Sequence, residues 1–286
     1  MATFTNQALL TYNDTRTLSN ITTGQLTESL SVIKDSLQTS YSAGDRITYL
    51  LSVVNSGTAE RGNLTVTDDL GAIVPKGGTS EVCPLVYESG SIRSFLNGAP
   101  QPAPQVLSES PLTVAGLTVP AGGCLLLIYT AQLCAFAPLA QGSTVVNTAV
   151  VTGDGLSEPL TASYTLYVNE APYLTVEKTL SPLSVSANQR ITYTFVISNY
   201  GNADADENAN AVITDTITPP LTDLTVTYNG APWTESAEYT YEPGTGLFTT
   251  ADGEITVPAA TYTTAPDGTV TTIPGTVTLV VEGTVS

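Results

Sequence analysis

Histidine is absent from this chain of 286 residues, and basic residues are rare. Without histidine, the Ser-His and Cys-His nucleophile pairs, histidine general bases and histidine-containing zinc sites are all excluded. Eight Lys and Arg residues against 26 Asp and Glu residues give a net charge of −18. Such a chain offers no basic surface to nucleic acid or to an anionic membrane. The sequence also has no glycine-rich phosphate loop and no cysteine pair at metal spacing. We therefore predict a protein that is not an enzyme and needs no cofactor or metal.

Long hydrophobic runs are also absent. No segment approaches the roughly 20 apolar residues of a membrane-spanning helix, so we predict no membrane insertion. The N-terminus, MATFTNQALL, has no basic region ahead of an apolar one and is not recognisable as a secretory signal. The acidic loop NADADENAN at 202–210 is rich in oxygen ligands, but it lacks the ordered spacing and the closing Glu of a calcium loop. We interpret this loop as a solvated turn.

The chain is instead rich in alternating apolar and polar residues. RITYLLSVVN at 46–55 and RITYTFVISN at 190–199 follow a period of two residues, which is typical of half-buried strands. After Asn-x-Gly turns, LTVTD at 64–68 and VITDT at 212–216 read as the next strands. No segment carries helical periodicity. The sequence therefore predicts an all-β fold made of two antiparallel β-sandwiches.

The sequence contains two internal repeats. Residues 31–70 and 175–217 are copies of one body pattern, and TFTNQALLTY at 3–12 and TVVNTAVVTG at 144–153 are copies of one strand pattern. The order along the chain is therefore strand pair, body, strand pair, body. We predict an N-terminal pair of donor strands, a first sandwich with its own closing hairpin, and a second, incomplete sandwich. The corresponding ranges are 1–26, 27–169 with the hairpin at 144–168, and 170–286.

The repeated residues resemble a known family. The pattern is Lys, then Ala/Ser-Gly/Asn-x-Arg-Ile-Thr-Tyr, then Asn-x-Gly, then Val/Ile-Thr-Asp, and later Val-x-Asn-x-Ala-x-Val-Thr. It is similar to the bacterial repeat called domain of unknown function eleven, and it covers most of both bodies. The resemblance implies immunoglobulin-like β-sandwiches in an extracellular surface or fibre protein, without catalysis on a ligand. In that family the Asn-x-Ala hairpin closes the domain it follows. Here the second body has no such hairpin, and residues 3–26 follow no body.

A sandwich without its closing strands exposes an apolar groove and a row of unpaired backbone groups, which together form a template for another chain. We expect the N-terminal strands of one subunit to fill this groove in the second sandwich of the next subunit, by donor-strand complementation. Two alternatives are that the N-terminal hairpin adds an edge to the first body, or that it closes the second body of its own chain. Alternation places the side chains expected at the assembly interface on one face: Phe4, Asn6, Ala8, Leu10 and Tyr12.

A head-to-tail contact of this kind need not close, so it predicts a homopolymer. The predicted function is a self-assembling structural subunit of an extracellular filament, on the cell or spore surface, and the only partner expected is another copy of the chain. A protein without a signal can assemble in a cell that later lyses, and a spore appendage is therefore a specific form of the prediction. The alternative is a monomeric cell-surface adhesin or ligand-binding module. Such a module usually brings a secretion signal, an anchor motif or a long array.

Lys34 and Lys178 occupy equivalent positions in the first strand of the two bodies. The first interpretation is that both face solvent. In the second, each faces the core and forms an isopeptide bond to an Asn on the closing strand, as in immunoglobulin-like pilus and adhesin domains. Burial favours the neutral amine and the protonated acid that this bond requires. The two sets are Lys34, Asn147 and Asp68 within a subunit, and Lys178, Asp215 and Asn6 of the next subunit.

The cysteines all fall in the first body, at Cys83, Cys124 and Cys134. If the run between Cys124 and Cys134 is one strand, its ends lie about 33 Å apart, which is too far for a disulfide. Cys83 can pair with either of the other two, and the odd count leaves one thiol for an intermolecular bridge or for burial. The alternative is that all three are buried, inert thiols.

Overall fold

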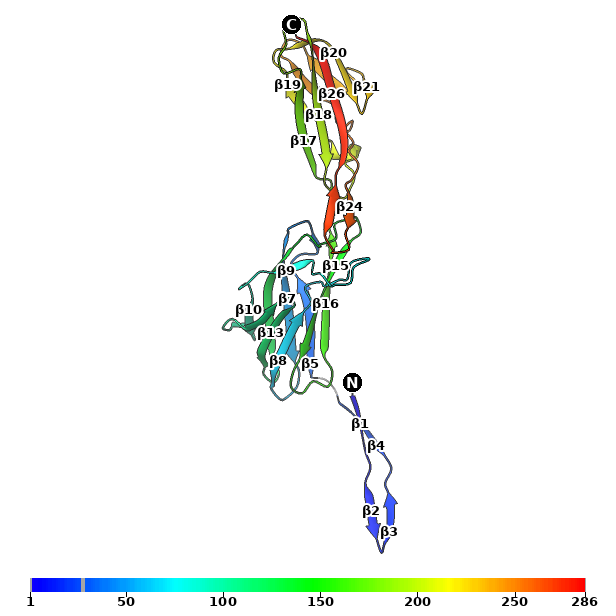
Figure 1. Ribbon diagram of the computed structural model, residues 1–286. Coiled ribbons are helices and arrows are strands. Elements are labelled where there is room, and N and C mark those ends of the chain that lie inside the picture. Colours follow the sequence, from blue (N-terminus) through cyan, green and yellow to red (C-terminus); the bar gives the residue numbers. More distant parts are fainter. Residues whose placement is uncertain (1, 27–28, 286) are drawn as a thin grey trace. The chain divides into compact units, whose positions relative to one another are not determined.

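The computed structural model describes residues 2–26 and 29–285. The chain divides into two compact units, each described below by itself. The first unit runs to Tyr167 and contains the N-terminal hairpin; the second begins at Val168 and includes the short segments 75–78 and 138–143. Residues 27–28, where the sequence predicts the start of the first sandwich, lie outside the described residues. The predicted all-β fold with immunoglobulin-like sandwiches is confirmed (Figure 1).

The first sandwich consists of two antiparallel sheets. One has the order β11-β10-β14-β7-β5, with β9 also paired to β14, and the other has the order β12-β13-β8-β15-β16-β6. The predicted inward residues of its central strand, Ile47 and Tyr49, are both 0% exposed. The strands are β5 (Leu30–Ser36), β6 (Ser40–Tyr41), β7 (Arg46–Asn55), β8 (Arg61–Asp68), β9 (Leu85–Tyr87), β10 (Arg93–Leu96), β11 (Ala99–Pro100), β12 (Gln105–Glu109), β13 (Leu112–Val119), β14 (Cys124–Leu133), β15 (Thr144–Thr152) and β16 (Leu160–Val168).

The second sandwich has a sheet of order β17-β18-β26-β20-β21 and a smaller one of order β19-β23-β22. A separate hairpin, β24–β25, projects from it. The acidic loop contains a single turn of 3-10 helix, η1 (Glu207–Ala209), and the side chain of its N-cap residue Asp206 accepts the Asn208 N–H. The strands are β17 (Leu174–Ser181), β18 (Arg190–Asn199), β19 (Thr214–Thr216), β20 (Leu221–Tyr228), β21 (Ala231–Trp233), β22 (Tyr239–Glu242), β23 (Leu247–Thr250), β24 (Thr261–Thr264), β25 (Val270–Ile273) and β26 (Gly275–Val285).

The sequence repeat is also a structural repeat. In the first sandwich Lys34 lies opposite Leu51, and in the second Lys178 lies opposite Phe195, so the first two strands pair in the same register. The corner after the second strand is also the same. The amide nitrogen of Asn55 donates to the carbonyl of Ala59 at 2.8 Å, and that of Asn199 donates to Ala203 at 2.8 Å. Equivalent positions in the two sandwiches can therefore be compared residue by residue.

The N-terminal hairpin consists of β1 (Ala2–Asn6), β2 (Leu9–Tyr12), β3 (Thr15–Leu18) and β4 (Thr22–Leu26). β1 pairs with β4 and β2 with β3. The single strand predicted over 3–12 is thus interrupted at residues 7–8, which corrects the sequence analysis. The cause lies in the return strand, which carries one extra residue opposite Gln7. There the hydroxyl of Ser19 accepts the Ala8 N–H at 2.9 Å, and the Ser19 N–H donates to the Ala8 carbonyl at 2.9 Å.

Candidate functional site

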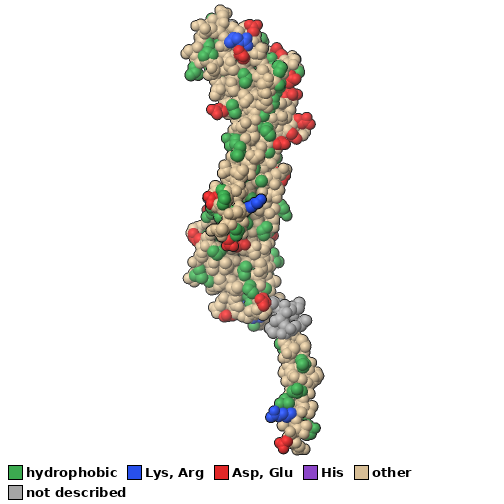
Figure 2. All heavy atoms as spheres, turned by 45° about the vertical axis from the view of Figure 1, so that its right-hand side comes forward, with side chains coloured by type: hydrophobic (Ala, Val, Ile, Leu, Met, Phe, Trp, Pro, Cys, Tyr) green, Lys and Arg blue, Asp and Glu red, His purple; other side chains and the backbone are tan. Residues whose placement is uncertain are grey.

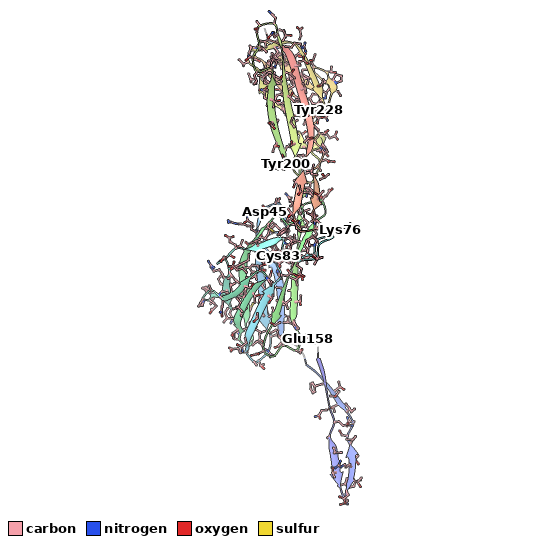
Figure 3. The ribbon with its side chains drawn as sticks, viewed as in Figure 1. Asp45, Lys76, Cys83, Glu158, Tyr200 and Tyr228 are labelled. Atoms are coloured by element: carbon pink, nitrogen blue, oxygen red, sulfur yellow. The ribbon has the colours of Figure 1, made fainter. Side chains whose placement is uncertain are left out.

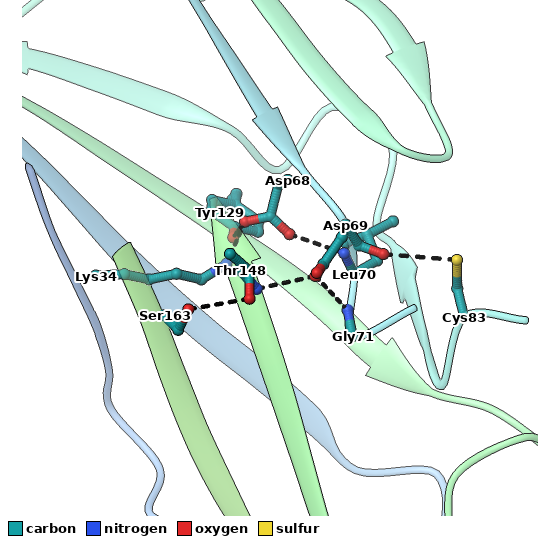
Figure 4. Close-up of polar contacts among 9 residues, drawn as sticks. All are labelled: Lys34, Asp68, Asp69, Leu70, Gly71, Cys83, Tyr129, Thr148 and Ser163. Atoms are coloured by element: carbon teal, nitrogen blue, oxygen red, sulfur yellow. Dashed lines mark hydrogen bonds and ion pairs between the residues drawn. The ribbon is translucent and has the colours of Figure 1, made fainter. Parts of the chain in front are cut away.

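A lysine and an aspartate form a buried ion pair in the first sandwich. Lys34 on β5 donates to Asp68 at the end of β8, and their side chains are 0% and 1% exposed. The hydroxyl of Tyr129, on β14, donates to the same Asp68 oxygen, as Figure 4 shows. The expectation that Lys34 faces solvent is therefore wrong. Lys34 lies on the inward face of β5, the edge strand of one sheet, where the Asp68 carboxylate compensates its charge.

Two tyrosine rings enclose the amine. The Lys34 Nζ lies 4.9 Å from the centroid of the Tyr49 ring and 6.0 Å from that of Tyr129, and the two rings stack at 5.5 Å. Desolvation is the main influence here: it lowers the pKa of Lys34, an effect that Asp68 opposes, and it raises the pKa of both tyrosines. Burial therefore stabilises the neutral form of this amine relative to the ammonium more than water does.

Asn147 completes this cluster from β15. Its side chain is 0% exposed and faces the hydroxyls of Tyr49 and Tyr129. Burial raises the pKa of Tyr49 and Tyr129, and the Asn147 amide is close enough to both hydroxyls to oppose that rise, but no hydrogen bond of good geometry joins Asn147 to either tyrosine. Buried polar atoms are nearly always paired, and each unpaired one costs about 1–3 kcal/mol. The Asn147 amide therefore lies next to the two tyrosines that enclose the Lys34 amine, and both groups are shielded from water.

The neighbouring residue holds β15 in this register. The backbone N–H of Thr148 donates to the Asp69 side chain at 2.9 Å, and the Asp69 N–H donates to the Thr148 carbonyl at 2.9 Å. One further step along, Ala149 pairs with Asp68. Figure 4 shows Thr148 and Asp69 joined next to the lysine pair. The acid and the strand that carries Asn147 are therefore fixed to each other.

The second sandwich repeats the lysine pair without the covering strand. Lys178 on β17 donates to Asp215 on β19, and its Nζ lies 4.5 Å from the centroid of the Tyr193 ring. Here the lysine and aspartate side chains are 38% and 18% exposed. The residue equivalent to Tyr129 is Val281, since both lie opposite the equivalent tyrosines of the central strands. The predicted pairing of Lys178 with Asp215 thus holds, but this pair remains open to water.

An unpaired strand edge lies beside this second lysine pair. In the first sandwich β8 is flanked by β13 and β15, whereas within the described residues β19 pairs only with β23. A groove of about 140 Å³ opens next to it, with Val176 59% and Val212 41% exposed. The groove is lined by Leu174, Thr175, Val176, Ile197, Ala211, Val212, Ile213 and Ile255. The position that β15 occupies in the first sandwich is therefore an apolar groove with a free backbone edge.

The predicted interface residues of the hairpin carry exposed apolar side chains. Phe4, Leu10 and Tyr12 are 54%, 62% and 54% exposed, and Asn6 and Ala8 are exposed as well. Both backbone groups of Ala8 bond to Ser19 of the return strand. At Ala8 the backbone groups of the first hairpin strand therefore face the return strand.

All three thiols are free in the structure, and no disulfide joins Cys83, Cys124 and Cys134. Cys124 begins β14 and Cys134 follows its last residue, so one strand separates them, as the sequence predicts. The Cys134 thiol donates to the Cys83 carbonyl at 3.1 Å, and the Cys83 thiol to the Asp69 carbonyl at 3.6 Å. Burial raises the pKa of Cys83 (labelled in Figure 3), which disfavours its reactive thiolate.

Charged side chains are sparse over the visible surface (Figure 2). Among the residues that the structure describes, there is no helix with the length and apolar character needed to cross a bilayer. The acidic loop 202–210 forms turns and η1, and no cluster of three or more His, Cys, Asp or Glu ligands is found in the described part of the chain. The candidate functional features are therefore the two lysine–aspartate pairs and the open edge of β19.

No protein-family model matches the chain, and no curated protein matches it. Among solved structures, the chain is similar to BcpA, the major pilin subunit of Bacillus cereus, with 14% identity over 96% of this chain and 73% of that chain and a TM-score of 0.37. It is also similar to a 35 kDa C-terminal fragment of GBS80, the major pilin of Streptococcus agalactiae, with 13% identity, coverages of 87% and 91% and a TM-score of 0.35. It is similar, too, to the collagen-binding domain from a Staphylococcus aureus adhesin, with 12% identity over 49% of this chain and 99% of that chain and a TM-score of 0.31. At such low identities and TM-scores these likenesses carry no weight for function.

Proposed function

We propose that the chain is a structural subunit of an extracellular filament, in which the first hairpin strand of one copy fills the groove of the second sandwich of the next. The observation that carries the proposal is the match between β15 and residues 3–12. β15 covers the lysine pair of the first sandwich, and its sequence copy is exposed while the equivalent lysine pair of the second sandwich is uncovered. Strand addition at an open sheet edge supplies the missing backbone partners and buries the groove.

The register follows from the first sandwich. Because Ala149 lies opposite Asp68 there, the sequence match places Ala8 of the incoming strand opposite Asp215. Val145, Asn147, Ala149 and Val151 of β15 are all buried. Their counterparts are Phe4, Asn6, Ala8 and Leu10, which therefore face into the groove. The contact joins unlike surfaces of two copies, so it propagates head to tail.

The same register predicts the covalent locks. In each, neutral Lys Nζ attacks the Asn side-chain carbonyl carbon, a C–N bond forms, and the bond from that carbon to Nδ2 breaks. The aspartate takes the lysine proton and, as a carboxylic acid, hydrogen-bonds the amide oxygen. The leaving nitrogen departs as ammonia with a proton lost by the lysine nitrogen, and the acid is regenerated. Lys34 would bond to Asn147 within the subunit, and Lys178 to Asn6 of the next.

This chemistry also gives the order of events. Lys178 is 38% exposed in the single chain, whereas Lys34, under β15, is 0% exposed. An incoming strand would exclude water from Lys178 as β15 excludes it from Lys34, and the amide it brings arrives in the same step. Assembly therefore precedes the intersubunit bond. A non-enzymatic fibre on the cell or spore surface, with its own copies as partners, is the role that fits these features.

Deletion of residues 1–26 tests the proposed function. The shortened chain should keep both sandwiches and form no filaments in negative-stain electron microscopy. Trp233, the only tryptophan, stacks on Tyr228 (labelled in Figure 3) at 4.9 Å and reports folding of the second sandwich. Filaments of normal length from the shortened, folded chain would refute the donor-strand proposal, and would leave a monomeric surface module or a different contact to be tested.

A further inference from the structure

The hairpin has a return strand, and in the first sandwich the equivalent strand has its own place in the sheet. There β16 follows β15, and β6 pairs with β16 as the outermost strand. The Tyr167 N–H donates to the Thr39 carbonyl at 3.1 Å, and the Tyr41 side chain is 0% exposed. The closing element of the first sandwich therefore makes contact along both of its edges.

The second sandwich has an exposed apolar segment at the position of β6. Lys34 and Arg46 are separated by the same number of residues as Lys178 and Arg190, so Leu183 is equivalent to Thr39 and Val185 to Tyr41. Leu183 is 87% exposed, the highest value among the exposed large apolar side chains of the described residues, and Val185 is 38% exposed. In the first sandwich Tyr41 is buried while Thr39 and Ser40 are exposed, so the two copies of the repeat differ at the position of Val185, which is buried in one and partly uncovered in the other.

The hairpin copies the pairing of the closing element it resembles. Thr144 pairs with Tyr167 in the first sandwich, and Thr3, the counterpart of Thr144, pairs with Gln25. By this register the backbone of Gln25 stands where that of Tyr167 stands. Its N–H is then available to a carbonyl at the position of Leu183.

The first inward-facing cross-strand pair lies at the same position in the closing element and in the hairpin, although the residue types differ. In the first sandwich Val145 lies opposite Leu166, and these side chains are 2% and 0% exposed. In the hairpin Phe4 lies opposite Gly24, and a Cβ added to Gly24 would lie 2.3 Å from the Phe4 ring. The ring therefore extends across the return strand, so that both strands share one apolar face.

We propose that the hairpin enters the next subunit as a pair of strands, with β4 docking along residues 183–185 while β1 fills the groove beside β19. Gln25 donates its N–H to the Leu183 carbonyl, and Val185 becomes buried as Tyr41 is in the first sandwich. This inference rests on the proposed function and adds a second contact edge to it. The occupant is the return strand of a second copy.

The test replaces Leu183 and Val185 by aspartate in the full chain. Leu37→Asp is the matched control, because Leu37 is 69% exposed in the equivalent strand connection of the first sandwich. The critical concentration for assembly, measured by sedimentation, should rise about tenfold for L183D/V185D, since a charged aspartate at 185 cannot be buried in place of the apolar side chain, and should not change for L37D. An equal critical concentration for both variants would overturn the inference.

Two further measurements keep the outcome interpretable. Trp233 fluorescence checks that the second sandwich is folded, and Val185→Ala replaces the double variant if that variant does not fold. Phe4→Ala separates the two proposals. If it raises the critical concentration while the change at Val185 does not, only β4 docking is refuted, and if neither has an effect, the donor-strand function falls as well. In wild-type filaments, hydrogen exchange should show protection at 22–26 and 183–185 relative to the single chain. Unchanged exchange at both would also overturn the inference.

Discussion

The two lysine sites of this chain share register and chemistry but differ in what covers them. Lys34 and Asp68 are shielded from water, and Asn147 of β15 is buried next to the two tyrosines that border them. Lys178 and Asp215 form the same pair beside a groove and a free strand edge. Under the proposed function, the first site shows the arrangement that the second site adopts when a matching strand binds. The difference teaches that one repeat pattern can hold the same lysine pair either covered or open to water.

The largest expected effect comes from removing the acid of the closed site. Asp68→Ala should leave Lys34 buried without a partner, which typically costs about 3–5 kcal/mol, and should prevent the bond to Asn147. Intact-mass spectrometry should then give the mass of the unmodified chain, whereas the wild type should be lighter by one ammonia. Circular dichroism during urea unfolding should show the stability loss.

Asp215→Ala is the control for this prediction. Its lysine partner is 38% exposed, and pairs in contact with water contribute about 0–1 kcal/mol. The unfolding transition of Trp233, which lies in the second sandwich, should therefore shift little. Equal losses from Asp68→Ala and Asp215→Ala would mean that the two sites do not differ in the way the exposed fractions indicate, and a wild-type mass equal to that of the unmodified chain would exclude the Lys34–Asn147 bond.

An intermediate effect is expected at the hairpin face. Burying Phe4 in the next subunit contributes about 1.5–3 kcal/mol, and each 1.4 kcal/mol is about a tenfold change in affinity. Phe4→Ala should therefore raise the critical concentration for assembly by about tenfold or more. Thr5→Ala changes the neighbouring residue on the opposite face and should have little effect. If the two substitutions have equal effects, another face of the hairpin makes the contact.

The smallest effect is the pH dependence of the closed site. The Asn147→Ala variant keeps Lys34 as a free amine, and burial lowers its pKa from 10.5. The unfolded chain then binds more protons than the folded chain between the lowered pKa and 10.5, so stability should rise with pH in that window. Burial raises the pKa of Tyr41 from 10.0 to about 12 and that of Tyr49 still further, so stability should fall above pH 10.

If the proposed bond forms in the wild type, Lys34 is part of an amide and does not titrate, so only the fall above pH 10 should remain. Urea unfolding of both proteins at several pH values, followed by circular dichroism, measures this difference. A rise of the same size in the wild type would show that Lys34 is still an amine.

Much of the fold can be predicted from the sequence because alternation and an internal repeat are both visible in the order of residues. The repeated strands 46–55 and 190–199 fix the central strand of each sandwich, and the repeat alone predicts that Lys34 belongs with Asp68. Tyr129 was missed because it joins the site through pairing of β14 with β7, which lies far away in sequence, and no motif marks it. A search of the apolar run between Cys124 and Cys134 for a hydroxyl in register with Tyr49 would have found it.

The hairpin interruption and the exposure of the two lysines could not be predicted, because both depend on neighbouring strands and not on alternation within one strand. The interruption of the hairpin at residues 7–8 arises from one extra residue in the return strand, which shifts register without altering the alternation of residues 3–12. The solvent-facing interpretation of the lysines was wrong for Lys34 because period-two alternation does not say which face of an edge strand is covered. Lys178 shows the reverse case. It has the same strand pattern, but its pair with Asp215 stays partly exposed because no described strand occupies the position that β15 has in the first sandwich.

The most direct test of the account is tandem mass spectrometry of protease-digested wild-type filaments. The account predicts a branched peptide in which the side chain of Lys178 is joined to that of Asn6, with the loss of one ammonia, and filaments that keep a ladder of multimers in hot detergent with reductant. Lys178→Ala filaments should lose both. Wild-type filaments in which Lys178 and Asn6 are recovered only in separate, unmodified peptides would contradict the claim that the second site is completed by the Asn6 of another copy.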